Sequence, residues 1–145
     1  MPTLKFINKS NNPLPEYKTP GSSGMDVRAD IDSPITVQPL RRVIVPTGLY
    51  PEIPEGYEIQ VRPRSGLAVN NGITVLNTPG TVDESYRGEI KVALINLGSE
   101  SFVINPGDRI AQLVLCKYER AEVIPVDEIS ETERGDSGFG STGTS

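Results

Sequence analysis

Hydrophobic and polar residues alternate strictly over 57–62, YEIQVR. Tyr57, Ile59 and Val61 would face one side of a strand there, and the polar residues between them the other side. Further segments rich in β-branched residues predict strands over 3–7, 25–30, 35–38, 42–48, 72–76, 89–97, 101–104 and 109–118. Turn residues such as the Asn-Pro-Gly run at 105–107 separate them. The pattern predicts about ten strands and favours a sandwich or jelly roll.

Only residues 65–70, SGLAVN, have the character of a short helix. From about residue 128 onward the alternation ends, and charged residues give way to a glycine-rich terminus. We therefore expect one all-β domain over residues 1–127, a jelly roll or distorted β-barrel. A mobile C-terminal arm over residues 128–145 is expected to follow it.

Composition restricts the chemistry more than it restricts the fold. The 145-residue chain has a net charge of −5, which argues against nucleic-acid binding. It has no histidine, so a Ser-His-Asp or Cys-His nucleophile and an ordinary zinc site are excluded. The single cysteine, Cys116, cannot form an internal disulfide and is predicted to be a buried thiol. Any enzyme must therefore rely on carboxylates, arginines, backbone amides and a hard cation such as Mg²⁺.

The sequence contains neither a membrane or export signal nor a usable dinucleotide-binding motif. No apolar run is long enough to cross a membrane and no signal peptide is recognisable, so we expect a cytoplasmic protein without a membrane partner. The run GFGSTG at 138–143 has the glycine spacing of a dinucleotide-binding motif. That motif must lie between a strand and a helix, and nothing here provides them.

The run 62–68, RPRSGLA, is the first candidate for chemistry. Arg64, Ser65 and Gly66 place a guanidinium, a hydroxyl and an unobstructed amide at the start of a possible helical turn. Such groups suit a phosphate. Taken alone, the run more simply indicates an arginine beside a helix N-cap at Ser65.

The run 77–89, NTPGTVDESYRGE, predicts a β-hairpin with the Asp83 carboxylate and the Tyr86 phenol near its tip. An aspartate can act as a general base when it holds a water in line with an electrophile. Without further context, Asp83 would more often be a turn residue. By composition alone, the terminal run 134–145 would be disordered, which leaves its arginine and Phe139 unexplained.

Together these segments resemble the trimeric dUTPases, the deoxyuridine triphosphate nucleotidohydrolases. The resemblance rests on five motifs in family order: GSSGMDVRA (21–29), RPRSGLA (62–68), NTPGTVDESYRGEI (77–90), NPGDRIAQLV (105–114) and RGDSGFGSTG (134–143). Five ordered motifs are far more specific than any single match. The resemblance implies a jelly-roll subunit in a homotrimer that uses Mg²⁺ to hydrolyse dUTP to dUMP and pyrophosphate. Such an activity limits uracil in DNA and supplies dUMP for thymidylate synthesis.

The resemblance also implies an active site shared by three chains. One chain would supply the hairpin, another the first, second and fourth motifs, and the third the C-terminal arm. Asp83 would activate the attacking water, and Arg134 would stabilise the charge that develops on the phosphates. Asp26 would hold the metal through water, while the substrate phosphates hold Mg²⁺ directly.

The remaining implied contacts are to the substrate. The residues are Arg64, Ser65, Gly66, Asn77, Gly80, Thr81, Val82, Tyr86, Lys91, Gln112, Phe139, Gly140, Ser141 and Thr142. Phe139 would lie over the uracil ring. Tyr86 would stack under the deoxyribose and reject a 2′-hydroxyl, while residues near Asn77 would pair with the uracil edge.

Two alternatives remain. The related dCTP deaminases share the fold but carry a catalytic glutamate in the strand after the hairpin. That position corresponds here to Ala93, and no carboxylate lies between Glu89 and Glu100. The second alternative, a catalytically silent jelly-roll trimer, would have no need for the combination of Asp83, Tyr86 and the terminal motif.

Overall fold

The structure, a computed structural model, describes all 145 residues. It contains eleven strands and one helix. The strands are β1 (Lys5–Asn8), β2 (Gly24–Arg28), β3 (Ile35–Val37), β4 (Arg42–Pro46), β5 (Leu49–Glu52), β6 (Tyr57–Arg62), β7 (Ile73–Val75), β8 (Gly80–Val82), β9 (Lys91–Asn96), β10 (Phe102–Ile104) and β11 (Arg109–Lys117), and the helix is α1 (Ser65–Asn71). The prediction of an all-β fold is confirmed.

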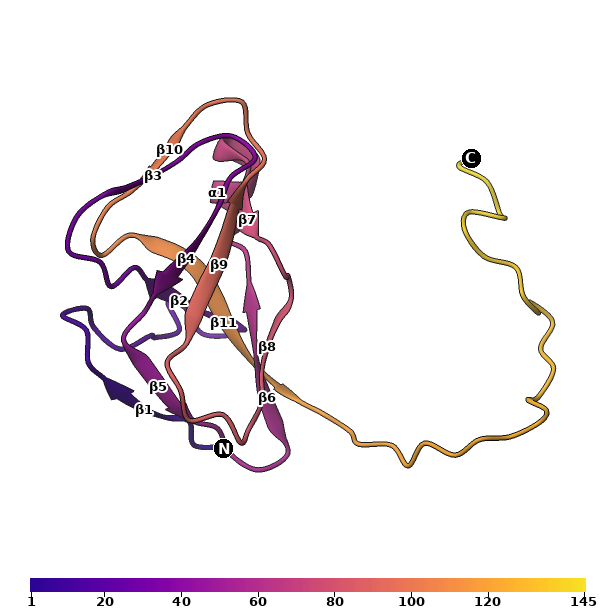
Figure 1. Cartoon of the computed structure of the whole chain (residues 1–145). Helices are drawn as coiled ribbons and strands as arrows, with labels where there is room; N and C mark the ends of the chain where they lie inside the picture. Colours follow the sequence, from indigo (N-terminus) through magenta and orange to yellow (C-terminus); the bar gives the residue numbers. More distant parts are fainter.

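The strands form a jelly-roll subunit from antiparallel sheets (Figure 1). One sheet has the order β2-β11-β6-β8 and another the order β4-β9-β7. Two short pairs, β1-β5 and β10-β3, complete the body. Non-consecutive strands lie side by side throughout, so the sheets bring together residues that are far apart in the sequence.

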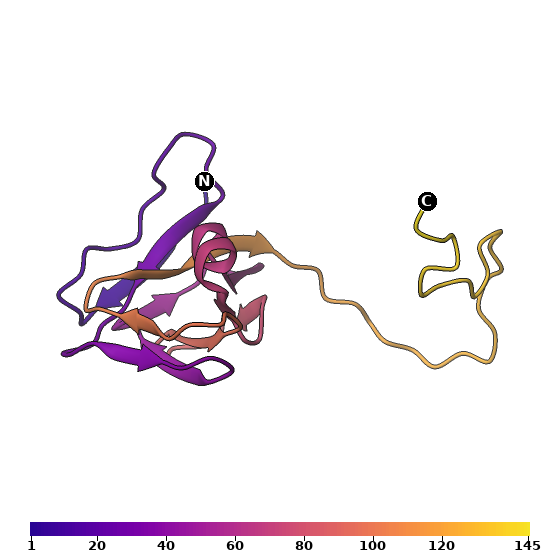
Figure 2. The same ribbon diagram turned by 90° about the horizontal axis from the view of Figure 1, so that it is seen from above.

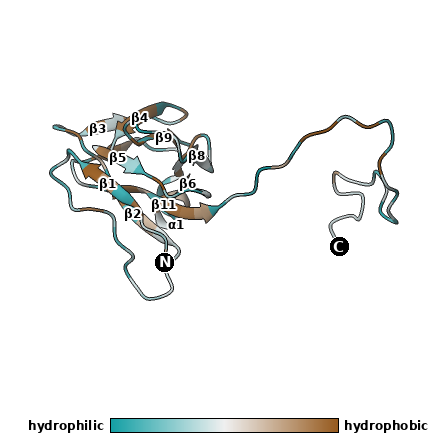
Figure 3. Ribbon diagram, turned by 90° about the horizontal axis from the view of Figure 1, so that it is seen from below, coloured by the Kyte–Doolittle hydropathy of each residue, from teal (hydrophilic) through white to brown (hydrophobic).

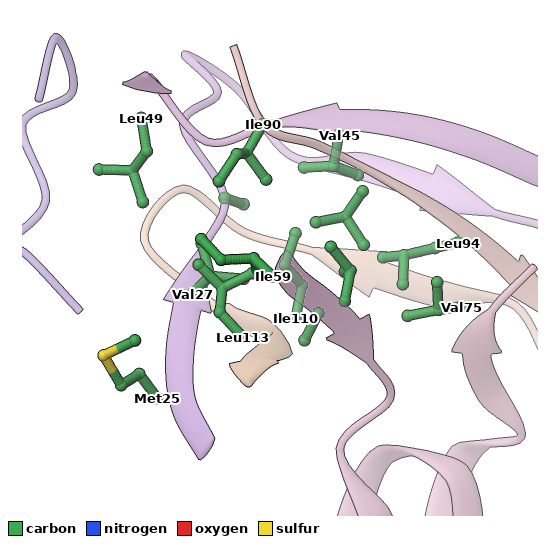
Figure 4. Packing of buried hydrophobic residues seen from close by; sticks show 14 of the residues in the cluster. Met25, Val27, Val45, Leu49, Ile59, Val75, Ile90, Leu94, Ile110 and Leu113 are labelled. Carbon is green, nitrogen blue, oxygen red and sulfur yellow. The ribbon is translucent and has the colours of Figure 1, made fainter. Parts of the chain in front are cut away.

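The interior is built from the inward-facing residues of the alternating strands. Ile59 and Val61 of β6 are buried, as are Val92 and Leu94 of β9. Eighteen buried hydrophobic residues form one cluster, and Figure 4 shows side chains from several strands pointing toward one another. Burying one such side chain stabilises a fold by about 1.5–3 kcal/mol. This cluster is therefore the main source of stability in the body.

Three features differ from the sequence prediction. β5 was missed because it contains Pro51, which disfavours strands but is tolerated where a strand has only one partner, here β1. β8 was predicted only as part of the hairpin over 77–89 and not as a strand of its own, because three residues are too few to show an alternation. Cys116 is half-exposed rather than buried, because the pairing of β11 with β2 ends at Val114.

Helix α1 begins and ends close to the predicted range of 65–70. Its N-cap residue is Arg64 in an extended conformation, with no side-chain hydrogen bond to the helix. Ser65 is the first helical residue, so the interpretation of Ser65 as the N-cap is wrong. No helix of the protein has the length and apolar character needed to cross a bilayer.

The turn after α1 depends on Gly72, which has φ of 70°. A Cβ at this position would clash with the backbone of Gly98. We expect Gly72→Ala to lower the free energy of unfolding by about 2 kcal/mol or more, measured by urea denaturation. Gly66→Ala is the matched control, because Gly66 lies within α1 and faces open space. Equal destabilisation of the two variants would contradict this account of the turn.

The chain leaves the body after β11 as an extended arm, residues 118–145 (Figures 1 and 2). Beyond Tyr118 its hydrogen bonds are local, such as the bond from Arg134 Nε to the Ser137 carbonyl at 2.9 Å. The arm nevertheless carries hydrophobic stretches (Figure 3), and its Val123 and Ile129 side chains are exposed. The predicted boundary between 127 and 128 falls within this extended segment.

Candidate active site

Sheet register assembles the first group of predicted site residues. Gln112 on β11 pairs with Asp26 on β2 and with Arg62 on β6. Its Nε2 donates to the Pro63 carbonyl at 3.0 Å, directly before Arg64. A Cβ at position 24 would clash with the Gln112 side chain, so a glycine there leaves room for this contact.

Asp26 bridges two arginines. Its Oδ1 accepts from Arg64 Nε at 3.1 Å and its Oδ2 from Arg109 Nη1 at 3.2 Å. Asp26 and Arg64 are largely shielded from solvent, which strengthens their attraction relative to an exposed pair. Two guanidinium groups share one carboxylate, so a net positive charge remains for an anion. We call Asp26, Arg64, Arg109 and Gln112 the arginine cluster.

The residues that follow Arg64 in the chain could contact an anion as well. Ser65 and Gly66 follow Arg64 and are exposed, so the hydroxyl and the backbone of this turn are accessible to a ligand. Arg109 was missed by the sequence analysis, although it lies inside the run 105–114 that was singled out. The motif therefore contained Arg109, but no role was assigned to its side chain.

The predicted hairpin at 77–89 is wrong in its pairing. β8 pairs with β6, whereas β9 pairs with β4 on one side and β7 on the other. Because both edges of β9 are occupied, it has no edge left for β8. The two predicted tip residues still lie in one turn, in which the Tyr86 amide donates to the Asp83 carbonyl at 3.0 Å.

A cavity of about 260 Å³ lies beside this turn. Thr81, Val82, Asp83, Tyr86, Glu89, Ile90 and Lys91 line it, so five predicted site residues meet there. The Asp83 carboxylate is exposed and forms no salt bridge. Asn77 lies outside the lining, but its Nδ2 would be 3.4 Å from a Cβ at Gly80, so these two residues are neighbours. An unpaired carboxylate in such a cavity can accept a proton from a bound water.

The Tyr86 ring is held by its surroundings. Its hydroxyl donates to the Glu89 carbonyl at 2.7 Å. A Cβ at Gly88 would overlap the ring, so only glycine permits this conformation. The ring thereby forms a fixed wall of the cavity that contains Asp83.

The predicted site residues of the arm reach neither the arginine cluster nor the cavity beside Asp83. Arg134, Phe139, Gly140, Ser141 and Thr142 are exposed and lie away from the body (Figure 2). The cavity beside Asp83 includes no member of the arginine cluster. No group of three or more His, Cys, Asp or Glu side chains could hold a metal ion. Within one chain, the Asp83 carboxylate, the arginine cluster and the end of the arm therefore lie apart from one another.

Known proteins resemble the chain over nearly its full length. A family model described as dUTPase matches residues 10–143. The deoxyuridine 5′-triphosphate nucleotidohydrolase of Finegoldia magna is 57% identical over 140 residues, covering 97% of this chain and 98% of that protein. The protein of the same name from Fusobacterium nucleatum is 59% identical, covering 97% and 96%.

Among solved structures, the dUTPase of Staphylococcus bacteriophage 80α with dUpNHpp is similar, with a TM-score of 0.85 at 26% identity. The alignment covers 98% of this chain and 99% of that chain. So little of this chain is left out that most of the arm must be included.

Proposed function

Since this chain belongs to the dUTPase family and is a dUTP diphosphatase that hydrolyses dUTP to dUMP, we propose roles in that reaction for its own residues. Asp83 is the general base. It orients a water and takes one of its protons while the water oxygen bonds to the α-phosphorus. The bond between that phosphorus and the oxygen bridging to the β-phosphate breaks, and pyrophosphate leaves. The exposed, unpaired carboxylate in the cavity supports this role.

The arginine cluster binds the triphosphate. Arg64 offers a guanidinium whose Nε is already held by Asp26, so its remaining donors are directed with little loss of side-chain entropy. Ser65 and Gly66 add exposed polar groups beside it, and Gln112 fixes the backbone that precedes Arg64. Negative charge grows on the leaving group, so a preorganised cation here stabilises the transition state.

The cavity beside Asp83 binds the nucleoside. Backbone groups at Thr81, Val82 and Lys91, with the Asn77 side chain, pair with the uracil edge. Because a buried polar group left unpaired is costly, such a site discriminates strongly against a base with the wrong donors. The Tyr86 ring stacks under the deoxyribose and leaves no room for a 2′-hydroxyl. Because Gly80 has no side chain, the Asn77 amide group can lie close beside it.

Magnesium is the proposed cofactor. Both Asp26 oxygens already accept from arginines, so Asp26 suits a contact through metal-bound water better than direct ligation. When bound to the triphosphate, Mg²⁺ neutralises phosphate charge and orients the phosphates. The chain has no dedicated cluster of metal ligands, which supports the phosphates as the main ligands.

The complete site is proposed to form in a homotrimer. Within one chain the cavity beside Asp83 contains no member of the arginine cluster, and the arm points away from both. The outward face of the β4-β9-β7 sheet carries Ile44, which is 66% exposed, next to Ala93 and Ile95. An apolar sheet face of this kind favours contact with another copy. The arm of a third chain then brings Arg134, Phe139, Gly140, Ser141 and Thr142 to the bound nucleotide.

The glycine next to the Tyr86 ring offers a test of sugar selection. Gly88→Ala is expected to displace the ring and to lower the ratio of kcat/KM for dUTP over UTP by about tenfold or more. Tyr86→Phe keeps the ring and the glycine, so it should retain most of the preference. An unchanged ratio in Gly88→Ala would contradict the proposed role of the ring.

The proposal rests on one observation, the cavity that Asp83 and Tyr86 line together with Thr81, Val82 and Lys91, the residues proposed to pair with uracil. The direct test is pyrophosphate release from dUTP, dCTP, dTTP and UTP, each with and without Mg²⁺. We expect release from dUTP with Mg²⁺ to exceed all other combinations. Ammonia release from dCTP would instead indicate a deaminase, which the absence of a carboxylate between Glu89 and Glu100 argues against.

A further inference from the structure

Asp83 also lines a second cavity, which shares no other lining residue with the first. This cavity of about 520 Å³ is formed by Asp83, Glu84 and Ser85 from the turn, Glu58 from β6, and Tyr118, Glu119 and Arg120 from the start of the arm. The turn that carries the general base therefore lies directly against the start of the arm from the same chain. The proposed reaction assigns no task to this second cavity.

Glu84 anchors the turn beside this second cavity. Its Oε2 accepts a hydrogen bond from the Gly56 amide at 2.6 Å. The Glu84 carbonyl accepts from Arg87 Nη1, also at 2.6 Å. Asp83 itself is exposed and forms no salt bridge, so its orientation depends on how firmly the neighbouring Glu84 is held.

Tyr118 anchors the arm at the same place. Its amide donates to the Gly56 carbonyl at 3.1 Å, and no residue after Tyr118 forms a hydrogen bond with the body. Tyr118 and Glu84 line the same cavity, and Glu84 is the main reason why the pKa of the Tyr118 hydroxyl is raised. Gly56 and Glu84 thus hold the turn and the arm together, and we call Gly56, Glu84 and Tyr118 the junction.

We propose that the junction couples the orientation of Asp83 to the direction in which the arm leaves the body, with Glu84 and Tyr118 as positioning residues for dUTP hydrolysis. This inference rests on the proposed three-chain site. There, Asp83 serves one active site while the arm of the same chain serves another. An arm held over a neighbour fixes Tyr118, Tyr118 fixes Glu84, and Glu84 fixes the turn. A disturbed junction therefore impairs two of the three active sites to which its chain contributes, the one that uses its Asp83 and the one that uses its arm.

The first test uses single variants in the homotrimer. Tyr118→Phe removes only the hydroxyl and should lower kcat for dUTP about three- to tenfold, the size of one ordinary net polar interaction. KM and the thermal midpoint should stay unchanged, because the substrate contacts and the core are intact. Tyr50→Phe, a hydroxyl deletion in β5, is the matched control and should behave as wild type.

A double variant separates a shared contact from two independent ones. Glu84→Ala combined with Tyr118→Phe should have the kcat of Glu84→Ala alone, because both changes remove the same interaction. Glu84→Gln keeps an acceptor for Gly56 and should lose less. Multiplicative losses in the double variant, or an unchanged kcat in Tyr118→Phe, would overturn the inference.

Mixed trimers test the link between two sites. Chains truncated after Glu133 supply Asp83 but no arm terminus, and Asp83→Asn chains supply the terminus, so active sites form only between the two kinds. Tyr118→Phe placed in either kind alone should lower the restored activity. If Tyr118→Phe lowers the activity when it is placed in only one of the two kinds of chain, the junction supports only one site and the proposed coupling is wrong. An inactive mixture without the Tyr118 change would instead refute the shared site, and the coupling with it.

Discussion

Asp83→Asn is expected to lower kcat for dUTP by about 10²- to 10⁴-fold, the usual contribution of a general base. Asparagine keeps the size and the turn geometry of the aspartate but cannot accept the proton of the attacking water. The turn should survive, because its hydrogen bonds use the Asp83 carbonyl and the Glu84 side chain rather than the Asp83 carboxylate. Steady-state pyrophosphate release would measure kcat. Titration with a non-hydrolysable dUTP analogue should give a Kd close to that of wild type.

Asp32→Asn is the matched control, because Asp32 is an exposed aspartate that belongs neither to the arginine cluster nor to the cavity beside Asp83. It should have wild-type kcat, Kd and thermal midpoint. Hydrolysis at the wild-type rate by Asp83→Asn would remove Asp83 from the mechanism. A large loss of analogue binding would show instead that the carboxylate acts in the ground state.

Removal of residues 134–145 is expected to lower kcat/KM for dUTP by at least about 10²-fold, comparable to the loss of a preorganised donor. The deletion takes away Arg134, which would neutralise the phosphates, and Phe139, which would cover the base. The thermal midpoint should not change, because this segment forms no hydrogen bond with the body. A chain truncated after Gly143 retains every proposed arm contact and should keep full activity.

The same truncation tests where the arm acts. Mixing chains truncated after Glu133 with Asp83→Asn chains should restore part of the activity that each lacks alone, once co-purification of two tags has shown that mixed trimers form. Each restored site would combine Asp83 from one chain with the arm from another. Mixed trimers without activity would mean that the arm and Asp83 of one site come from the same chain.

Much of the candidate site could be predicted because its residues lie in short contiguous runs. Thr81, Val82, Asp83 and Tyr86 are within six positions of one another, so one turn places them around one cavity whatever the surrounding sheets do. Arg64, Ser65 and Gly66 are consecutive and keep their relation at the start of α1. Local sequence controls local geometry when the interactions involved span only a few residues.

The contacts between distant runs could not be predicted in the same way. Nothing in a single strand indicates that Asp26 will pair with both Arg64 and Arg109, because the pairing arises from the register of β2 and β6 against β11. The predicted hairpin was wrong for a related reason. β8 and β9 are neighbours in the chain, but β9 already has β4 and β7 as partners.

The amino-acid sequence by itself determined the all-β class, the short helix and the extended terminus, and it supplied most residues of the candidate site. Each depends on periodicity, turn chemistry or a contiguous motif, which act over a few residues. Only the tertiary structure decided that Asp26 joins two arginines, that the turn of Asp83 meets the start of the arm at Gly56, and that the arm leaves its own body. These depend on which strand edges are free to pair. That competition among distant segments is resolved only when the core forms and all of them pack at once.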